Sequence, residues 1–350
     1  MLMGGAKSVT NLNRIGLVGA TLAVWPSLVT AQASGSSREL VLGAKQGFEI
    51  TIEVNDVPLR LRVDPSATGV ILLNPGAAAR AKLRPSRLDK KLARALGLEA
   101  EPEGLQSGSI GGHDVPVSTP DPSRTPAPAG AQTQLGSVQM RGKLALARAV
   151  IAGQSEQKVF SWFARDVISD ADGIISPAVL PFDTVRFKFR EPSNVERLVP
   201  FALDYSPLTG LIYRHPIAGH HVSVKFSVLE PATTATAAAA AVISAHLGGS
   251  WAGDRRMHSV GLGVTRPVRP LSLGAPLGIK SLSVDRLLVR ISDHRGGHAL
   301  PLDEPIGDDL LVTARSAQEA RYLLVVGQDT MGGCSELKYL RRNRIVMTCR

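Results

Sequence analysis

The chain has 350 residues, a formal net charge of +10 at neutral pH and only 4% aromatic residues. Its basic residues are interspersed with acidic ones and few aromatic rings are present for stacking bases, so we expect no nucleic-acid partner. The histidines lack metal-ligand spacing and the chain has no Walker or dinucleotide-binding motif. We therefore expect neither a metal nor a cofactor.

The first 33 residues have the pattern of a secretory signal peptide. Lys7 and Arg14 precede an apolar run over 15–29, and Ala31-Gln32-Ala33 supplies the small-residue pattern of a cleavage site. The run is shorter than the roughly 20 residues that a spanning helix needs, so we expect cleavage after Ala33 rather than a membrane anchor. The mature chain is predicted to be exported, to the periplasm or the extracellular space, without an integral membrane span.

Alternation of apolar residues predicts strands after the signal peptide. Residues 48–63 alternate on both sides of Asn55-Asp56, which is typical of a β-hairpin. A short buried strand is expected at 70–73, followed by a helix over 75–83. The proline-, glycine- and serine-rich stretch 101–134 is expected to form loops. Strands are expected again near Val138 and over 185–189.

A polar, proline-containing stretch at 191–197 marks the expected boundary between two lobes. Residues 221–228 alternate as a strand, and an alanine-rich helix that ends before Gly248-Gly249 follows. Further strands are expected at 282–291, 310–312, 323–326 and 345–347. Many short strands and few long helices predict a mainly β protein.

The two halves carry similar patterns, which indicates an internal duplication. Residues 63–68 (VDPSAT) match residues 229–234 (LEPATT) without a gap, and each segment lies between an alternating strand and a helix. Each half later carries two hydrophobic residues followed by a small one. These triplets are Ile174-Ile175-Ser176 and Val325-Val326-Gly327.

Two segments resemble elements of the pepsin-like and retropepsin-like aspartic proteases. Residues 59–83 (LRLRVDPSATGVILLNPGAAARAKL) resemble the strand, Asp-Thr/Ser-Gly turn and helix start of that family. Residues 172–176, followed by 182–187, resemble its later hydrophobic-hydrophobic-Gly element. The resemblance is clear over 48–189 and fainter beyond.

This resemblance implies a bilobal, aspartic-protease-like fold of two pseudo-symmetric β-lobes of the six-stranded type. The lobes are expected over residues 34–197 and 198–350. An extended peptide or protein would be the partner, and the chain would be a monomer or a weak dimer.

In this family two facing carboxylates share one proton, activate a water molecule and protonate the peptide carbonyl. The resemblance places Asp64 and Glu230 in these roles. Pro65 and Ser66 stand where the family has Thr/Ser and Gly, so a hydroxyl and an N–H donor are predicted to be missing beside Asp64. The Glu230 carboxylate extends one methylene further than an Asp, and Ser176 replaces a family Gly. We therefore expect weak or absent hydrolysis.

A glycine-rich loop is the candidate for the flap that covers substrate in this family. Its candidate residues are Gly108, Ile110, Gly111 and Gly112. The alternative interpretation is a glycine-rich loop without function.

The only two cysteines are Cys334 and Cys349, near the C-terminus. In an oxidising compartment such a pair predicts one disulfide, with two buried thiols as the alternative.

Three functions stay open at this point. The first is an exported, peptide- or protein-binding homologue of aspartic peptidases with weak or no hydrolytic activity. The second is an active acid endopeptidase that uses Asp64 with Glu230 or with the Asp64 of a second chain. The third is a structural cell-envelope protein with a basic surface.

Overall fold

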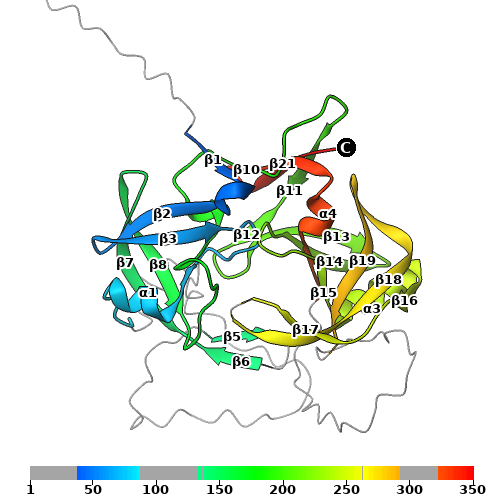
Figure 1. The fold of residues 1–350 in the computed structure, drawn as a ribbon, viewed down its shortest axis with the longest axis horizontal. Helices are drawn as coiled ribbons and strands as arrows, with labels where there is room; N and C mark the ends of the chain where they lie inside the picture. The colour runs from blue at the N-terminus through cyan, green and yellow to red at the C-terminus, as the bar shows by residue number, and fades with distance from the viewer. Residues whose placement is uncertain (1–37, 87–131, 136–137, 262, 292–321) are drawn as a thin grey trace, which may run out of the picture. The chain divides into compact units, whose positions relative to one another are not determined.

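The structure, a computed structural model, describes residues 38–86, 132–135, 138–261, 263–291 and 322–350 (Figure 1). The signal-peptide prediction, the flap candidates Gly108, Ile110, Gly111 and Gly112, and the strand predicted at 310–312 all lie outside these residues.

A closed six-stranded barrel is built from the N-terminal part of the chain. Its strand order is β2 (Glu49–Val54), β3 (Val57–Val63), β9 (Gly173–Ile175), β4 (Ile71–Leu73), β8 (Gln154–Trp162) and β7 (Lys143–Ile151). The predicted β2–β3 hairpin turns at Asn55 and Asp56, whose φ angles of 49° and 64° are those of a tight two-residue hairpin turn. Alternate side chains of β3 face the barrel interior, and Leu59, Leu61 and Val63 are completely buried.

The C-terminal part of the chain forms a nine-stranded sheet. Its order is β12 (Asp204–Ser206), β13 (Gly210–Ile217), β14 (His220–Phe226), β20 (Leu323–Val326), β15 (Thr234–Thr236), β19 (Leu282–Arg290), β18 (Thr265–Ile279) and β16 (Gly249–Trp251), and β17 (Arg256–Ser259) also pairs with β18. The alanine-rich helix α3 (Ala237–Leu247) lies against this sheet, and its first eight residues are all buried.

The barrel and the nine-stranded sheet share one pattern of strand pairing. In the barrel β2 and β3 pair antiparallel, β3 and β9 parallel, β9 and β4 antiparallel, β4 and β8 parallel, and β8 and β7 antiparallel. The sheet repeats this order and these directions with β13, β14, β20, β15, β19 and β18. A helix follows the corresponding strands β4 and β15, namely α1 (Pro75–Arg80) and α3. A short helical turn follows β9 and β20 in the same way, as η2 (Pro177–Val179) and α4 (Gln328–Met331).

A five-stranded sheet joins segments from both ends of the chain. Its order is β1 (Glu39–Gly43), β10 (Thr184–Lys188), β21 (Cys334–Leu340), β22 (Arg344–Cys349) and β11 (Arg197–Ala202). Its strands therefore come from both sides of the boundary predicted at 191–197, and Ser37–Arg350 form one compact unit. The remaining elements are η1 (Ala44–Gln46), β5 (Gln132–Leu135) and β6 (Val138–Arg141).

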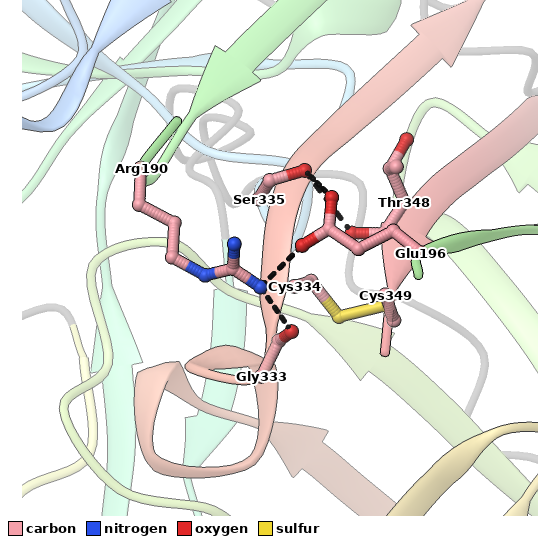
Figure 2. The surroundings of a disulfide bond; sticks show 7 residues. All are labelled: Arg190, Glu196, Gly333, Cys334, Ser335, Thr348 and Cys349. Carbon is pink, nitrogen blue, oxygen red and sulfur yellow. Dashed lines mark hydrogen bonds and ion pairs between the residues drawn. A yellow bond between two sulfur atoms is a disulfide. The ribbon is translucent and has the colours of Figure 1, made fainter. Parts of the chain in front are cut away.

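The predicted disulfide is present and connects β21 to β22 (Figure 2). Beside it, the guanidinium of Arg190 pairs with Glu196 and donates to the carbonyl of Gly333 at 2.7 Å. The Ser335 hydroxyl donates to the other carboxylate oxygen of Glu196 at 2.6 Å. The segment between β10 and β11 is thus fixed to β21 next to the disulfide.

The fold class is mainly β, as predicted. Among the described helices, none combines the length and the apolar character that crossing a membrane requires. The disulfide is compatible with an exported protein.

Candidate functional site

Asp64 is a buried carboxylate directly after β3. Its side chain accepts four hydrogen bonds, two on each oxygen. The hydroxyls of Ser66 and Ser227 donate to Oδ2 at 2.6 and 2.8 Å. The backbone N–H groups of Ser66 and Val228 donate to Oδ1 at 3.3 and 3.1 Å. Asp64 therefore joins the turn after β3 to the turn after β14.

Ser66 supplies the donors that Pro65 lacks at this turn. Pro65 itself has neither a hydroxyl nor an N–H to donate, but the hydroxyl and the N–H of Ser66 both donate to Asp64 in its place. The physical reason is that the chain turns back at Pro65, which brings residue i+2 to the carboxylate, as short Asp-containing turns commonly do.

Strand pairing identifies Ser227 as the counterpart of Asp64 in the second half. The N–H of Asp64 donates to the carbonyl of Ile175, the last residue of β9, at 2.9 Å. The N–H of Ser227 donates to the carbonyl of Val326, the last residue of β20, at 3.0 Å. The sequence match aligned Glu230 with Asp64. Strand pairing instead aligns Asp64 with Ser227, three residues earlier.

The Ser227 hydroxyl has a defined direction. Its oxygen accepts the N–H groups of Leu229 and Glu230, at 3.3 and 3.1 Å, so its own proton is free to point to Asp64. With the Ser66 hydroxyl also donating, Oδ2 of Asp64 receives two O–H groups. This geometry suits a carboxylate that acts as an acceptor only.

Lys225 places a positive charge near Asp64. It lies two residues before Ser227 on β14, and its ammonium donates to the carbonyl of Ser66 at 3.1 Å. Burial lowers the pKa of Lys225 to about 8, and the negative charge of Asp64 opposes that shift. Burial in turn raises the pKa of Asp64, while its hydrogen bonds to Ser66, Ser227 and Val228 act in the opposite direction.

Glu230 belongs to the edge of this group. Burial first, and the negative charge of Asp64 second, raise the pKa of Glu230 to about 7. Its Oε2 lies 3.4 Å from Nε2 of His258 on β17. Burial and the nearby Arg256 lower the pKa of His258, which favours the neutral imidazole. Glu230 is thus connected to Asp64 through its own N–H and the Ser227 hydroxyl.

Two polar side chains fix the surrounding turns. Asn74 stands at the start of α1, and its amide accepts from the N–H of Val167 at 2.8 Å and donates to the carbonyls of Ile168 and Ala171 at 2.7 and 2.8 Å. In the second half, the hydroxyl and N–H of Thr233 donate to Asp329 at 2.7 and 2.9 Å.

Gly327, the small residue of the Val325-Val326-Gly327 triplet, is at a position where the structure has no room for a side chain. A Cβ at this position would lie 2.5 Å from the carbonyl carbon of Ala232 and 2.9 Å from the carbonyl oxygen of Glu230. The turn that carries Glu230 can approach the end of β20 only because residue 327 lacks a side chain.

Of the predicted site residues, Asp64 lies at the centre of this arrangement and Glu230 at its edge. Ser227, Lys225 and His258 were not singled out by the sequence. A signal for the first two exists, because Lys225 and Ser227 occupy alternate positions at the end of an alternating strand and so share a face with each other. In the described ranges, no cluster of three or more His, Cys, Asp or Glu side chains is suited to hold a metal ion.

Comparison of the chain with protein-family models and with curated proteins finds no match. The site comprises one buried carboxylate, two serine hydroxyls that donate to it and one partly buried lysine, with a Glu–His contact at the periphery.

Proposed function

We propose that this chain is an exported protein of the bilobal aspartic-peptidase-like type that binds an extended peptide or protein without hydrolysing it. The repeated strand-pairing pattern supports the duplicated architecture. The position of Asp64 at the turn after β3 supports its correspondence to the catalytic Asp of that family.

The observation that carries the proposal is that Ser227 takes the position corresponding to Asp64. Hydrolysis by a carboxylate pair needs one ionised member to take a proton from water and one protonated member to give a proton to the carbonyl oxygen. A serine hydroxyl does not ionise in the acid range and cannot share a proton in this way. The site therefore has one carboxylate where the reaction needs two.

The hydrogen bonds around Asp64 support the same conclusion. Both of its oxygens are already occupied by two donors each. A water molecule positioned for attack would have to displace one of these donors. Lys225 adds a positive charge that partly balances Asp64, a role that a shared proton fills in a working pair.

An acid endopeptidase that uses Asp64 with Glu230 is the second candidate, and one observation favours it. The charge of Asp64 contributes to raising the pKa of Glu230 to about 7, so the two carboxyl groups interact electrostatically. Against it stands the placement of Glu230, whose carboxylate contacts His258 and whose position in the turn is three residues beyond the counterpart of Asp64.

The test uses the chain from Ser34 onward and a library of unstructured peptides between pH 3 and pH 8. We expect binding in a fluorescence anisotropy assay and no cleavage products in mass spectra. Ser227→Asp restores a second carboxylate, and acid-dependent cleavage by this variant alone would support the assignment. Ser283→Asp, at an exposed position of β19, is the matched control and should stay inactive.

Two outcomes would count against the proposal. Acid-dependent cleavage by the native chain that disappears in both Asp64→Asn and Glu230→Gln would establish the endopeptidase instead. Failure of every peptide in the library to bind at any pH would remove peptide binding as the function.

A further inference from the structure

Positively charged side chains share one face of the β17–β18 pair. The two strands pair over four register partners, so their side chains alternate between two faces (Figure 1). The register pairs Arg256 with Val268 and His258 with Arg266. Val268 in turn pairs with Arg290 of β19. Because the side chains of paired residues lie on the same side of a sheet, the three arginines and the histidine share one face, called the basic face below.

The opposite face of the same two strands carries no charge. Its residues are Met257, Ser259, Thr265 and Pro267. Met257 is 63% exposed there, whereas Val268 on the basic face is completely buried. The basic face is therefore the one that lies against the rest of the molecule.

His258 shows what the basic face lies next to. Its Nε2 is 3.4 Å from Oε2 of Glu230, whose N–H donates to the Ser227 hydroxyl. Ser227 donates to Asp64, so a short series of contacts joins the basic face to the buried carboxylate. Burial first, and the charge of Arg256 second, lower the pKa of His258, which places Arg256 in the same neighbourhood. The basic face thus borders the candidate site at Glu230.

The site adds positive charge of its own and little negative charge. Lys225, with a pKa of about 8, is mostly protonated at pH 7. Glu230, with a pKa of about 7, carries only about half a charge at that pH. Asp64 is buried, and both of its oxygens already accept hydrogen bonds. An approaching chain therefore meets a positive charge at this place.

The sequence also concentrates positive charge in this part of the nine-stranded sheet. Residues 249–291, which contain β16 to β19, include seven arginine or lysine residues and two aspartates. This segment has a net charge of +5, half of the formal +10 of the whole chain. Six of the seven are arginines, whose planar guanidinium can bind both oxygens of a carboxylate at once.

We propose that the basic face of β17 and β18 binds carboxylate side chains, so that this protein selects extended peptides rich in Asp and Glu. The inference rests on the proposed peptide-binding function and names the class of peptide. Alternate side chains of an extended peptide point to the same side, so acidic residues at every second position can all meet the basic face. Arg256 is the exposed member of that face and makes the first contact with such a peptide.

The first test compares three fluorescent peptides of equal length on the chain from Ser34 onward. Every second position holds Glu in the acidic peptide, Gln in the neutral peptide and Lys in the basic peptide. We expect the acidic peptide to bind at least about tenfold more tightly than the neutral one at low salt, and the basic peptide to bind most weakly. The preference should shrink as salt is added, because salt screens exposed charges. Fluorescence anisotropy measures all three, and no variant is needed.

The second test assigns the preference to Arg256. We expect Arg256→Gln to weaken binding of the acidic peptide by about threefold to fivefold and to leave binding of the neutral peptide unchanged. Arg256→Glu should shift the preference towards the basic peptide. Arg344→Gln removes the same charge from an exposed position of β22 in the five-stranded sheet, and this matched control should bind like the native chain.

The outcomes separate this inference from the proposed function. Equal binding of the acidic and neutral peptides by the native chain would overturn the acidic preference and leave peptide binding standing. Equal losses in Arg256→Gln and Arg344→Gln would show a general effect of net charge and overturn the assignment to the basic face. Dextran sulfate that competes as strongly as unlabelled acidic peptide, at equal charge, would overturn the peptide in favour of any polyanion. A chain that binds none of the three peptides would refute the proposed function, and this inference with it.

Discussion

Asp64 is a group whose burial is unfavourable unless its oxygens are satisfied. Moving a carboxylate out of water costs several kcal/mol, and hydrogen bonds from fixed donors are the usual compensation. Here two hydroxyls and two N–H groups from both halves of the duplicated pattern supply them. The residue that the resemblance assigns to chemistry thus has a structural task, which is to join the turns after β3 and β14.

Replacing Asp64 with Asn tests this structural task. The amide NH₂ would face hydroxyl or N–H donors on one side, and the loss of charge weakens the remaining bonds. We expect the free energy of unfolding to fall by about 1–3 kcal/mol, measured by urea denaturation at pH 7. Asp285→Asn, at an exposed position on β19, is the control and should change stability by less than about 0.5 kcal/mol. Equal stability of both variants would contradict this view of Asp64.

Glu230 gives a prediction about pH. Its pKa is about 7 in the folded chain against an ordinary value of 4.5, so the folded state binds this proton more tightly than the unfolded state. The associated stability is fully present below about pH 4.5 and is lost as the pH rises through about 7. The total loss is on the order of 3 kcal/mol. Lys225, whose pKa is lowered to about 8, changes stability in the opposite direction and only above that pH.

Glu230→Gln removes this titration while preserving the shape of the side chain. We expect the difference in unfolding free energy between the variant and the native chain to grow in favour of the variant from pH 4 to pH 7.5. Urea denaturation at several pH values measures it, and comparing the two proteins cancels most of the titration of Asp64 and His258, which both contain. A constant difference across this range would show that Glu230 is ionised in the folded chain well below pH 7.

At the scale of elements, the local patterns predicted several strands correctly, including the β2–β3 hairpin, β14, β20 and β22. The end of β14 was predicted two residues too late. The alternation continues through Val228, which is completely buried, although the strand ends at Phe226 and the turn begins at Ser227. The similar sequences VDPSAT and LEPATT then favoured the alignment of Asp64 with Glu230, whereas strand pairing aligns Asp64 with Ser227. Alternation places Ser227 on one face with Lys225, but only strand pairing, a long-range property, reveals Ser227 as the counterpart of Asp64.

Other strands were missed because their composition is atypical. The 15-residue strand β18 contains Pro267, Pro270 and Pro276, residues that normally indicate turns or edge strands. It tolerates them partly because its register with β19 shifts between Ser272 and Leu277. The strand β8 begins with five polar residues, QSEQK, and shows its buried face only from Val159 onward.

Asn74 carries a prediction for the elements around the site. Its amide holds the loop 167–171 through both its oxygen and its nitrogen, rather than capping α1. Asn74→Ala would leave buried backbone groups of that loop without partners, and we expect a loss of about 1–3 kcal/mol. Thermal or urea unfolding measures it, with the exposed Asn194→Ala as control. A variant as stable as the control would mean that water replaces these hydrogen bonds.

At the scale of the molecule, the five-stranded sheet is the element that makes one unit out of two repeated patterns. β1 and β10 belong to the barrel side of the chain, while β11, β21 and β22 belong to the other side. The β10–β21 pair runs over five register partners, from Thr184 with Leu340 to Lys188 with Glu336. The ion pair of Arg190 and Glu196 adds a side-chain contact beside this junction (Figure 2).

The disulfide contributes to this sheet. Closing a loop of 15 residues stabilises a chain by about 3 kcal/mol in the loop-entropy model. We expect Cys334→Ala with Cys349→Ala to lower the free energy of unfolding by about 2–4 kcal/mol, and the double variant to be insensitive to a reducing agent. Reduction of the disulfide in the native chain, verified by thiol titration, should lower the free energy of unfolding by a similar amount. Unchanged stability of the reduced native chain would contradict the estimate.

Cooperativity between the two patterns is the last prediction. From Ser34 onward the sequence has two tryptophans, Trp162 in the barrel strand β8 and Trp251 in β16 of the nine-stranded sheet. The five-stranded sheet, the hydrogen bonds of Asp64 and the packing of Val264 on Phe163 all connect the barrel with the nine-stranded sheet. We therefore expect neither part to unfold alone. Trp251→Phe and Trp162→Phe make single-tryptophan reporters for each part. Each variant's fluorescence transition in urea should coincide with its own far-ultraviolet circular dichroism transition. A fluorescence transition that precedes the circular dichroism transition in one reporter would show that its part unfolds independently, and that the shared sheet couples the two less strongly than its pairing indicates.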